Sequence, residues 1–266
     1  MREPRVMGVV NVTPDSFSDG GRFLERDAAV AHGRELAADG AGFLDIGGES
    51  TRPGADPVPE AEELRRVLPV IEGLADAGPA ISIDTTKLAV ARAAVEAGAL
   101  MVNDVSAFRF DPELAGLVAD AGVDCCLMHM LGEPRTMQAE PRYDDVVSDV
   151  RAFLEERLAF AVAEGVPEER VWLDPGIGFG KTLEHNLEML RRLGEIVAIG
   201  RPVMIGTSRK SFLGKLTGRP EAERLPGTIA TNVLAYERGA TMFRVHDVRE
   251  VADALAVAAA TVGMDG

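Results

Sequence analysis

The chain has 266 residues, of which 46% are apolar and 27% are charged. This length and composition allow a sizeable core, which excludes an intrinsically disordered chain and a small disulfide-stapled protein. With 28 Lys and Arg against 43 Asp and Glu, the net charge is −15, which would repel a phosphodiester backbone, so we expect no binding to nucleic acid.

The two cysteines, Cys125 and Cys126, are neighbours within an apolar run. Adjacent cysteines are poorly placed to cross-link two parts of a chain, and two thiols are too few for a four-ligand zinc site. This usage is typical of a reducing compartment. Because no apolar run approaches the roughly 20 residues needed to cross a bilayer, and no signal-peptide segment opens the chain, we expect a cytoplasmic protein outside the membrane.

Eight short apolar runs recur along the chain, each followed by a polar residue or a glycine. Such runs predict strands that are buried on both faces, as in a parallel sheet. In chain order they span Val6 to Val10, Phe43 to Ile46, Ala80 to Ile83, Leu100 to Val102, Cys125 to Met128, Val171 to Leu173, Val203 to Ile205 and Met242 to Val245.

The intervals between these runs have a helical period, most clearly in residues 64–74, 147–161 and 183–193. Every interval is long enough for the crossover that joins two parallel strands. Eight strand-helix units predict an α/β protein built as a closed (β/α)8 TIM barrel, since an open sheet would leave two edge strands to protect. No composition shift marks a linker, so we expect residues 1–266 to form a single domain.

The residue that follows each predicted strand is polar or glycine. In a barrel these positions meet at one rim, where barrel enzymes place their active sites. Each could instead cap the next helix, because Asn and Asp favour that position, but so many on one rim favour a shared site. They are Asn11, Gly47, Asp84, Asn103, His129, Asp174, Gly206 and His246.

The glycine-rich segment LDPGIGFGKT, residues 173–182, does not match a phosphate-binding loop, because Pro175 stands where that motif needs its first glycine. Its glycine spacing also fails the dinucleotide-binding fingerprint. The segment is either a loop that lets the backbone approach closely beside Asp174 or simply a tight turn.

Two basic segments follow the last two predicted strands. In IGTSRKSFLG, Lys210 precedes Ser211, which could open a short helix of the kind that binds anions in barrels; a solvated basic loop is the alternative. In FRVHDV, Arg244 and His246 alternate as on a strand and can face one anion, whereas a buried salt bridge is the alternative for Arg244. No Ser/His/Asp set or zinc spacing is present, so the chemistry should need no protein nucleophile.

The polar loops NVTPDSFSDGG, residues 11–21, and GGESTRPGA, residues 47–55, are candidate lids, or else ordinary surface turns. In chain order, the strand-end segments are NVTPDSFSDGG, LDIGGESTRPGA, SIDTTK, NDVSAF, HMLGEPRTMQ, LDPGIGFGKT, GTSRKSFLG and FRVHDV. Together they resemble the dihydropteroate synthase family over about residues 6–248.

This resemblance implies a pterin-binding barrel, usually a homodimer, that uses Mg²⁺. Its members join 6-hydroxymethyl-7,8-dihydropterin diphosphate to 4-aminobenzoate and release pyrophosphate. By position, the resemblance assigns the pterin to Asp84, Asn103, Asp174 and Lys210, with Met128 and Arg244 along its faces. It assigns the diphosphate to Arg244 and His246, with Asn11 as the protein ligand of Mg²⁺. It assigns 4-aminobenzoate to Thr51, Arg52, Pro53, Phe179, Lys210 and Ser211. The expected catalytic residues are Arg52, Lys210, Arg244 and His246.

Two alternatives differ in class. A pterin-binding methyltransferase module shares the barrel and the pterin-binding Asp and Asn positions, but it has no reason to keep Arg52, Lys210, Ser211 and His246. A paralogue that holds a pterin or a phosphate without turning it over stays open, because the intact loops only weigh against it.

Overall fold

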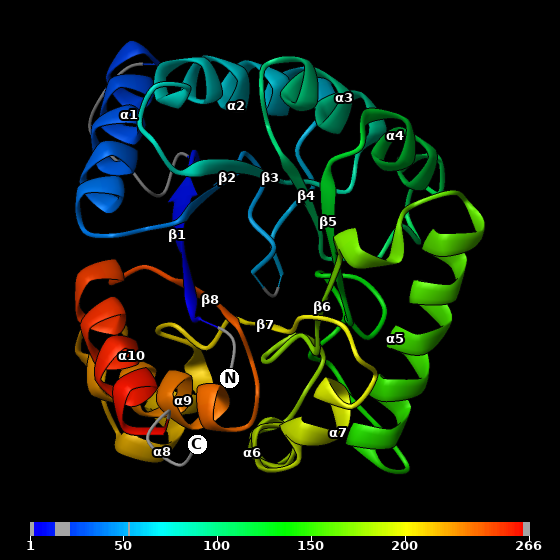
Figure 1. Ribbon diagram of the computed structural model, residues 1–266, viewed down its shortest axis with the longest axis vertical. Helices are drawn as coiled ribbons and strands as arrows, with labels where there is room; N and C mark the ends of the chain where they lie inside the picture. Colours follow the sequence, from blue (N-terminus) through cyan, green and yellow to red (C-terminus); the bar gives the residue numbers. More distant parts are fainter. Residues whose placement is uncertain (1–2, 14–21, 53, 263–266) are drawn as a thin grey trace.

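The computed structural model describes residues 3–13, 22–52 and 54–262. Eight parallel strands form a ring at the centre, and the helices surround it (Figure 1). The strands are β1 (Arg5–Asn11), β2 (Phe43–Gly47), β3 (Ala80–Asp84), β4 (Met101–Asp104), β5 (Asp124–Met128), β6 (Val171–Asp174), β7 (Met204–Ile205) and β8 (Met242–Val245).

The helices alternate with the strands along the chain. They are α1 (Arg22–Ala38), α2 (Glu60–Leu74), α3 (Leu88–Glu96), α4 (Glu113–Ala121), α5 (Val146–Ala163), α6 (Leu183–Arg191), α7 (Leu193–Val197), α8 (Ser211–Thr217), α9 (Leu225–Glu237) and α10 (Val248–Val262), with short 3-10 turns η2 (Glu168–Arg170) and η3 (Glu221–Glu223). No helix in the described ranges combines the length and the apolar character that a membrane crossing needs.

The ring of strands is closed. Its order is β6-β5-β4-β3-β2-β1-β8-β7, and a parallel bridge between Leu173 of β6 and Val203, just before β7, joins the two ends. The Leu173 amide also donates to the Pro202 carbonyl at 3.0 Å. The predicted (β/α)8 barrel is therefore confirmed.

Several strands run slightly further than their apolar runs predict. β4 ends at Asp104 because Asn103 and Asp104 still pair with Cys126 and Leu127 of β5. A polar residue expected just after a strand is thus often part of the strand itself. Its side chain then takes its direction from the alternation of the strand, which sets whether it faces the barrel interior.

The barrel interior changes from apolar to polar along the strands. One side chain from each strand fills it near the N-terminal ends, and these are Met7, Phe43, Ala80, Met101, Cys126, Trp172, Met204 and Met242. Two residues further along β2 and β3 lie Asp45 and Ser82, which are both fully buried. Outward-facing side chains such as Leu44 and Ile83 instead join the helices in the main core.

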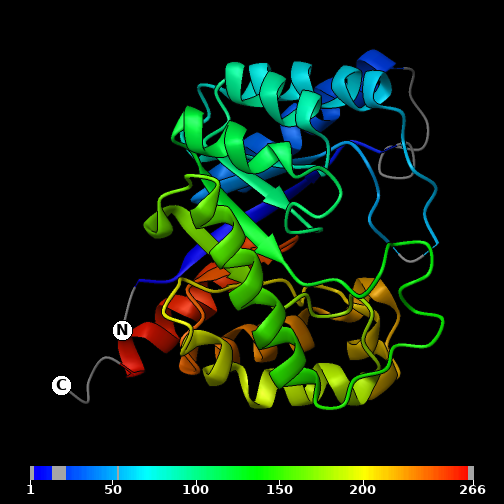
Figure 2. The same cartoon turned by 90° about the vertical axis from the view of Figure 1, so that its right-hand side faces the viewer.

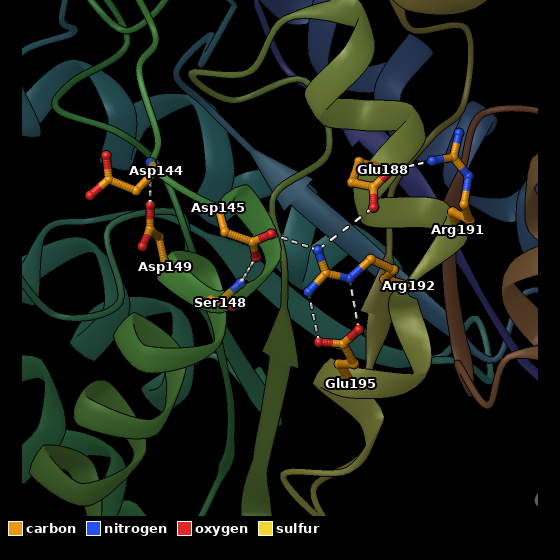
Figure 3. A network of polar contacts seen from close by, with 8 residues as sticks. All are labelled: Asp144, Asp145, Ser148, Asp149, Glu188, Arg191, Arg192 and Glu195. Atoms are coloured by element: carbon orange, nitrogen blue, oxygen red, sulfur yellow. Dashed lines mark hydrogen bonds and ion pairs between the residues drawn. The ribbon is translucent and has the colours of Figure 1, made fainter.

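The predicted helix over residues 183–193 is broken at Arg192, where the backbone has φ −102° and ψ 20°. The guanidinium of this residue contacts three carboxylates (Figure 3), those of Asp145 at 2.7 Å, Glu195 at 2.7 Å and Glu188 at 3.6 Å. Because Asp145 caps α5 by accepting from the Ser148 amide at 2.7 Å, the contacts fasten α5 to the turn between α6 and α7.

Both thiols should be inert in the folded protein. Cys125 and Cys126 are fully buried, and burial raises the pKa of each thiol above its ordinary value, which keeps it protonated and unreactive. We expect neither to react with a thiol-exchange reagent in native buffer and both to react in denaturant. Fast labelling of one thiol in native protein would show that this part of the barrel opens.

Candidate active site

A cavity of about 550 Å³ opens at the C-terminal ends of the strands. The loops after β2 and β5 come together at this end, toward which the β5 arrow points in Figure 2. The cavity is lined by every residue that the resemblance assigns to a substrate, to Mg²⁺ or to catalysis and that lies in the described part of the chain. These are Asn11, Thr51, Arg52, Asp84, Asn103, Met128, Asp174, Phe179, Lys210, Ser211, Arg244 and His246. Pro53 lies outside the described residues.

Strand register brings the first part of this set together. Asn11 of β1 is the partner of Gly47 on β2, Gly47 is the partner of Asp84 on β3, and Asp84 is the partner of Asn103 on β4. Neighbouring strands lie about 4.8 Å apart, so these residues form one level around the barrel. Gly47 adds no side chain at this level, and a Cβ there would make only an ordinary van der Waals contact with Asp84, 3.5 Å from its Cβ.

The floor of the cavity is an ion-pair network around Arg244. Its Nε donates to Asp45 Oδ2 at 2.6 Å, and its Nη2 donates to Asp84 Oδ2 at 2.9 Å. Asp45 also accepts from Asn103 Nδ2 at 3.0 Å and from Ser82 Oγ at 2.6 Å. One buried carboxylate of β2 thus holds side chains from β3, β4 and β8.

Sequence reasoning missed Asp45, although it carried a signal. It is a charged residue inside an otherwise apolar run, two positions before Gly47 and therefore on the same side of the strand. For Arg244 the structure shows the salt bridge that was the alternative interpretation. Its binding to a diphosphate stays a prediction, and within the described part of the chain its Nη1 has no hydrogen-bond partner.

Burial and ion pairing act against each other at this floor. Burial raises the pKa of Asp84, and the neighbouring Arg244 opposes the rise. Burial tends to lower the pKa of Arg244, but the carboxylates of Asp45 and Asp84 outweigh it and raise the pKa overall. Arg244 therefore stays charged near neutral pH.

Asn103 contributes an unused hydrogen-bond acceptor. Its amide nitrogen is engaged by Asp45, whereas its Oδ1 is buried without a partner among the described residues. A buried polar atom that lacks a partner costs free energy, and a ligand N–H would satisfy it. Because Asn103 lines the cavity, this atom marks a position for a donor-bearing ring.

A second charged pair lies on the β6 and β7 side. Asp174 ends β6, and Lys210 immediately precedes α8; the lysine Nζ donates to the Ile177 carbonyl and lies 4.6 Å from the Phe179 ring centroid. Burial lowers the pKa of Lys210 to about 8, and Asp174 opposes this shift. Burial also raises the pKa of Asp174, with Lys210 acting in the opposite direction.

The glycine-rich segment after β6 is a tight turn whose backbone approaches its neighbours closely. Gly176 has φ +66°, and a Cβ there would lie 1.9 Å from the His129 carbonyl oxygen. Gly178 has φ +84° and packs against the Lys210 side chain. The Gly176 amide donates to Asp174 Oδ1 at 2.7 Å, so the turn also orients that carboxylate.

His129 is the one strand-end polar side chain that the structure places behind the cavity wall. Its Nδ1 lies 2.9 Å from Lys181 Nζ, and both side chains are buried. Burial and the neighbouring ammonium lower the pKa of His129 to about 2, so the ring is neutral and accepts a hydrogen bond from the lysine. The pair supports the loop that carries Phe179, whose carbonyl lies 3.2 Å from Lys181 Nζ.

His246 faces the cavity with its orientation set by Ser208. Ser208 Oγ accepts from the His246 amide at 3.1 Å and lies 3.0 Å from His246 Nδ1. Burial, with help from Arg244, lowers the pKa of His246 to about 4, so the imidazole is neutral near pH 7. If the serine hydroxyl donates to Nδ1, the proton of the ring lies on Nε2 and is free to bind an anion. Sequence reasoning did not single out Ser208.

The outer rim carries the remaining predicted residues. Arg52 is 71% exposed and reaches Glu221 of η3 at 3.3 Å. Ser211 begins α8 beside Lys210, which confirms the short helix expected there. Arg209 instead forms a two-bond ion pair with Asp247, so the basic segment is only partly solvated.

The comparisons with known proteins show which family the chain belongs to. A family model described as pterin binding enzyme matches residues 7–246. Dihydropteroate synthase from Mycobacterium leprae is 49% identical over 264 residues, covering 96% of this chain and 93% of the relative. The chain belongs to the dihydropteroate synthase family.

Solved structures give the same family. The Xanthomonas albilineans dihydropteroate synthase with 4-aminobenzoic acid has a TM-score of 0.93 at 51% identity, covering 98% of this chain and 94% of the other. The same enzyme in complex with 7,8-dihydropteroate has a TM-score of 0.89 at 48% identity, covering 98% and 95%.

The lowered pKa of Lys210 predicts a loss of activity at high pH without unfolding. As pH rises through about 8 the ammonium loses its proton, and kcat/KM should decline. Between pH 8 and the ordinary pKa of 10.5, Lys210 binds more protons in the unfolded chain than in the folded protein. The contribution of Lys210 to the free energy of unfolding therefore rises with pH over this range. Profiles of kcat/KM against pH measure the loss of activity, and denaturant titrations at the same pH values measure the free energy of unfolding.

The variant Lys210→Arg provides the control for that profile. Arginine stays charged over the whole range, so the decline near pH 8 should disappear, whatever the residual activity. A profile that keeps the same decline in this variant would assign it to another group, such as Lys181, whose pKa burial lowers to about 7.

Proposed function

We propose that the chain condenses 6-hydroxymethyl-7,8-dihydropterin diphosphate with 4-aminobenzoate to give 7,8-dihydropteroate and pyrophosphate. One observation carries the proposal: a single cavity gathers the predicted acids, amide and bases on one rim of the barrel. Relatives about half identical over nearly the full length have structures named with 4-aminobenzoic acid and with 7,8-dihydropteroate.

The pterin would lie across the carboxylates of Asp84 and Asp174. A carboxylate that accepts from a ring N–H forms a charge-assisted bond of about 1.5–3 kcal/mol. The unpartnered Oδ1 of Asn103 supplies a further acceptor, and the ammonium of Lys210 supplies a donor for a ring acceptor. Met128 would line one face of the ring.

The diphosphate would lie toward Arg244 and His246. The Nη1 of Arg244 and the Nε2 of a neutral His246 are donors at the mouth of β8, where a leaving group gains negative charge. The overall charge of −15 does not oppose this, because exposed carboxylates more than about 8 Å away are largely screened at physiological salt.

Asn11 would be the protein ligand of Mg²⁺. Among the described residues there is no group of three or more His, Cys, Asp or Glu side chains that could hold a metal ion. Mg²⁺ commonly binds substrate phosphates with only one or two protein ligands, so the diphosphate would supply further oxygens. When bound, Mg²⁺ would neutralise charge on the diphosphate oxygens.

The reaction would begin with the bond between the pterin methylene carbon and the diphosphate oxygen. That bond breaks with its electron pair leaving on pyrophosphate, which Arg244 and His246 stabilise. The amine of 4-aminobenzoate then donates its lone pair to the methylene carbon and loses one proton. A proton on an arylammonium is acidic, so it can pass to the departing pyrophosphate without a strong protein base.

The 4-aminobenzoate would occupy the rim. Phe179 and Lys210 would flank its ring, and Thr51, Arg52 and Ser211 would surround its other end, together with the predicted Pro53. The N-terminus of α8 at Ser211 would face the substrate carboxylate. The loop after β2 would close over the amine and keep water out. The loop after β1 was predicted to act with it, but its residues 14–21 lie outside the described part of the chain.

The two alternatives fare differently. The residues that a methyltransferase module has no reason to keep, Arg52, Lys210, Ser211 and His246, all line the one cavity, and the curated relatives are dihydropteroate synthases. A non-catalytic paralogue differs only in turnover. Pyrophosphate release that depends on Mg²⁺ and on 4-aminobenzoate separates it from an enzyme.

Association as a homodimer and a cytoplasmic location are also proposed, on the resemblance to the family. Leu234 of α9 and Val257 of α10 leave apolar side chains exposed on helices that pack side by side (Figure 1). Sedimentation of the purified chain would measure whether it forms a homodimer.

Lys210→Ala and Asp174→Ala should each cut product formation at least about a hundredfold, because each removes a charged group that would contact the pterin ring. The assay follows 7,8-dihydropteroate and pyrophosphate together. Near-normal turnover in both variants would reject these assignments, and circular dichroism confirms that each variant is folded.

A further inference from the structure

At the edge of the cavity, which Glu49 lines, three charged side chains form a compact network at the base of the loop that follows β2. Lys87 Nζ donates to Glu49 Oε2 at 2.5 Å and also forms an ion pair with Glu63. Glu63 is fully buried on α2, and its second oxygen accepts from Thr85 Oγ1 at 2.7 Å. The network joins the loop to the residue that follows Asp84.

Glu49 holds the loop at both of its ends. Glu49 lies at the start of the loop, just after β2. Its Oε2 also accepts from the amide of Val58, at the other end of the loop, at 2.9 Å. One carboxylate oxygen therefore pins residues 49 and 58 to each other and to Lys87. The Gly48 carbonyl adds a second fixed point, because it accepts from Arg66 Nη1 at 2.8 Å.

The outer part of the same loop has weaker contacts. The Gly54 amide donates to the Pro134 carbonyl at 3.2 Å, and Arg52 reaches Glu221 across exposed surface. Exposed ion pairs typically contribute about 1 kcal/mol or less. The path of Ser50, Thr51 and Arg52 along the cavity rim is therefore set mainly at the base.

Lys87 is the central residue of the network, because its positive charge lies between the two carboxylates. Burial tends to lower its pKa, but its hydrogen bonds to Glu49 and Glu63 outweigh this, and the pKa is raised overall. Without the ammonium, two carboxylates would face each other, one of them fully buried. Glu49 would then swing away and release the Val58 amide, which ties the base of the loop.

We propose that Glu49, Lys87 and Glu63 are positioning residues that hold Ser50, Thr51 and Arg52 in place to receive the arylamine substrate. None of the three needs to contact the pterin. The inference rests on the proposed function, because it assigns the rim after β2 to 4-aminobenzoate. It predicts that the network affects one substrate and spares the other.

The test compares Lys87→Met with a matched control, Arg192→Met. The two side chains are similarly exposed, Lys87 by 24% and Arg192 by 28%, and each contacts more than one carboxylate. The carboxylates that Arg192 contacts lie at the start of α5 and on α6 and α7, away from the loop after β2. In Lys87→Met, KM for 4-aminobenzoate should rise about tenfold while KM for the pterin diphosphate stays within about twofold. Arg192→Met should change neither KM by more than about twofold, and Lys87→Arg should recover most of the loss.

Hydrogen exchange gives a readout that needs no activity. The Val58 amide should exchange faster in Lys87→Met and at the wild-type rate in Arg192→Met. If Lys87→Met does not fold, the test uses Glu49→Gln instead. This variant weakens the ion pair with Lys87 but keeps an acceptor for the Val58 amide. It should raise KM for 4-aminobenzoate and leave KM for the pterin diphosphate unchanged.

The inference is overturned if KM for 4-aminobenzoate stays within twofold of wild type, or if both KM values rise equally. Unchanged exchange at Val58 would overturn it as well. Failure of the wild-type chain to form 7,8-dihydropteroate is a different result. It would reject the proposed function, whereas the exchange measurement would still decide whether the network holds the loop.

Discussion

The site depends on the compensation of one partly buried cation. Arg244 lies inside the barrel, where an isolated charge would be very costly, and the carboxylates of Asp45 and Asp84 on two other strands offset that cost. Because Asp45 also accepts from Asn103, the same interaction fixes the amide of a residue that lines the cavity. A net charge of −15 and a site for an anionic leaving group are thus compatible, since what matters is which charges lie within a few ångströms.

Much of the site follows from sequence through a geometric rule. Parallel strands end on one rim of a barrel, so polar residues at strand ends must meet there, whatever their distance along the chain. This is why Asp84, Asn103 and Asp174 could be placed in one cavity from apolar runs alone. The same rule does not fix the direction of a side chain. His129 directly follows β5, yet its side chain turns behind the cavity wall to Lys181.

Residues that sequence reasoning missed owe their roles to partners far away in the chain. Asp45 and Arg244 are separated by 199 positions, and Glu49 and Lys87 by 38. No local period reports such pairs, because they depend on how whole elements pack. Likewise the apolar pattern of residues 183–193 predicts one helix and does not reveal the break at Arg192, where contacts with α5 and α7 are made (Figure 3).

The most direct test of the central claim is a double-mutant cycle on the free energy of unfolding, with Asp45→Asn, Arg244→Met and the double variant. Leaving one buried charge unpaired typically costs about 3–5 kcal/mol. If the two charges compensate each other, the free energy of unfolding of the double variant should fall by less than the sum of the two single decreases. The difference should be about 2 kcal/mol or more. Losses that add to within about 0.5 kcal/mol would contradict it, because the two groups would then be energetically independent.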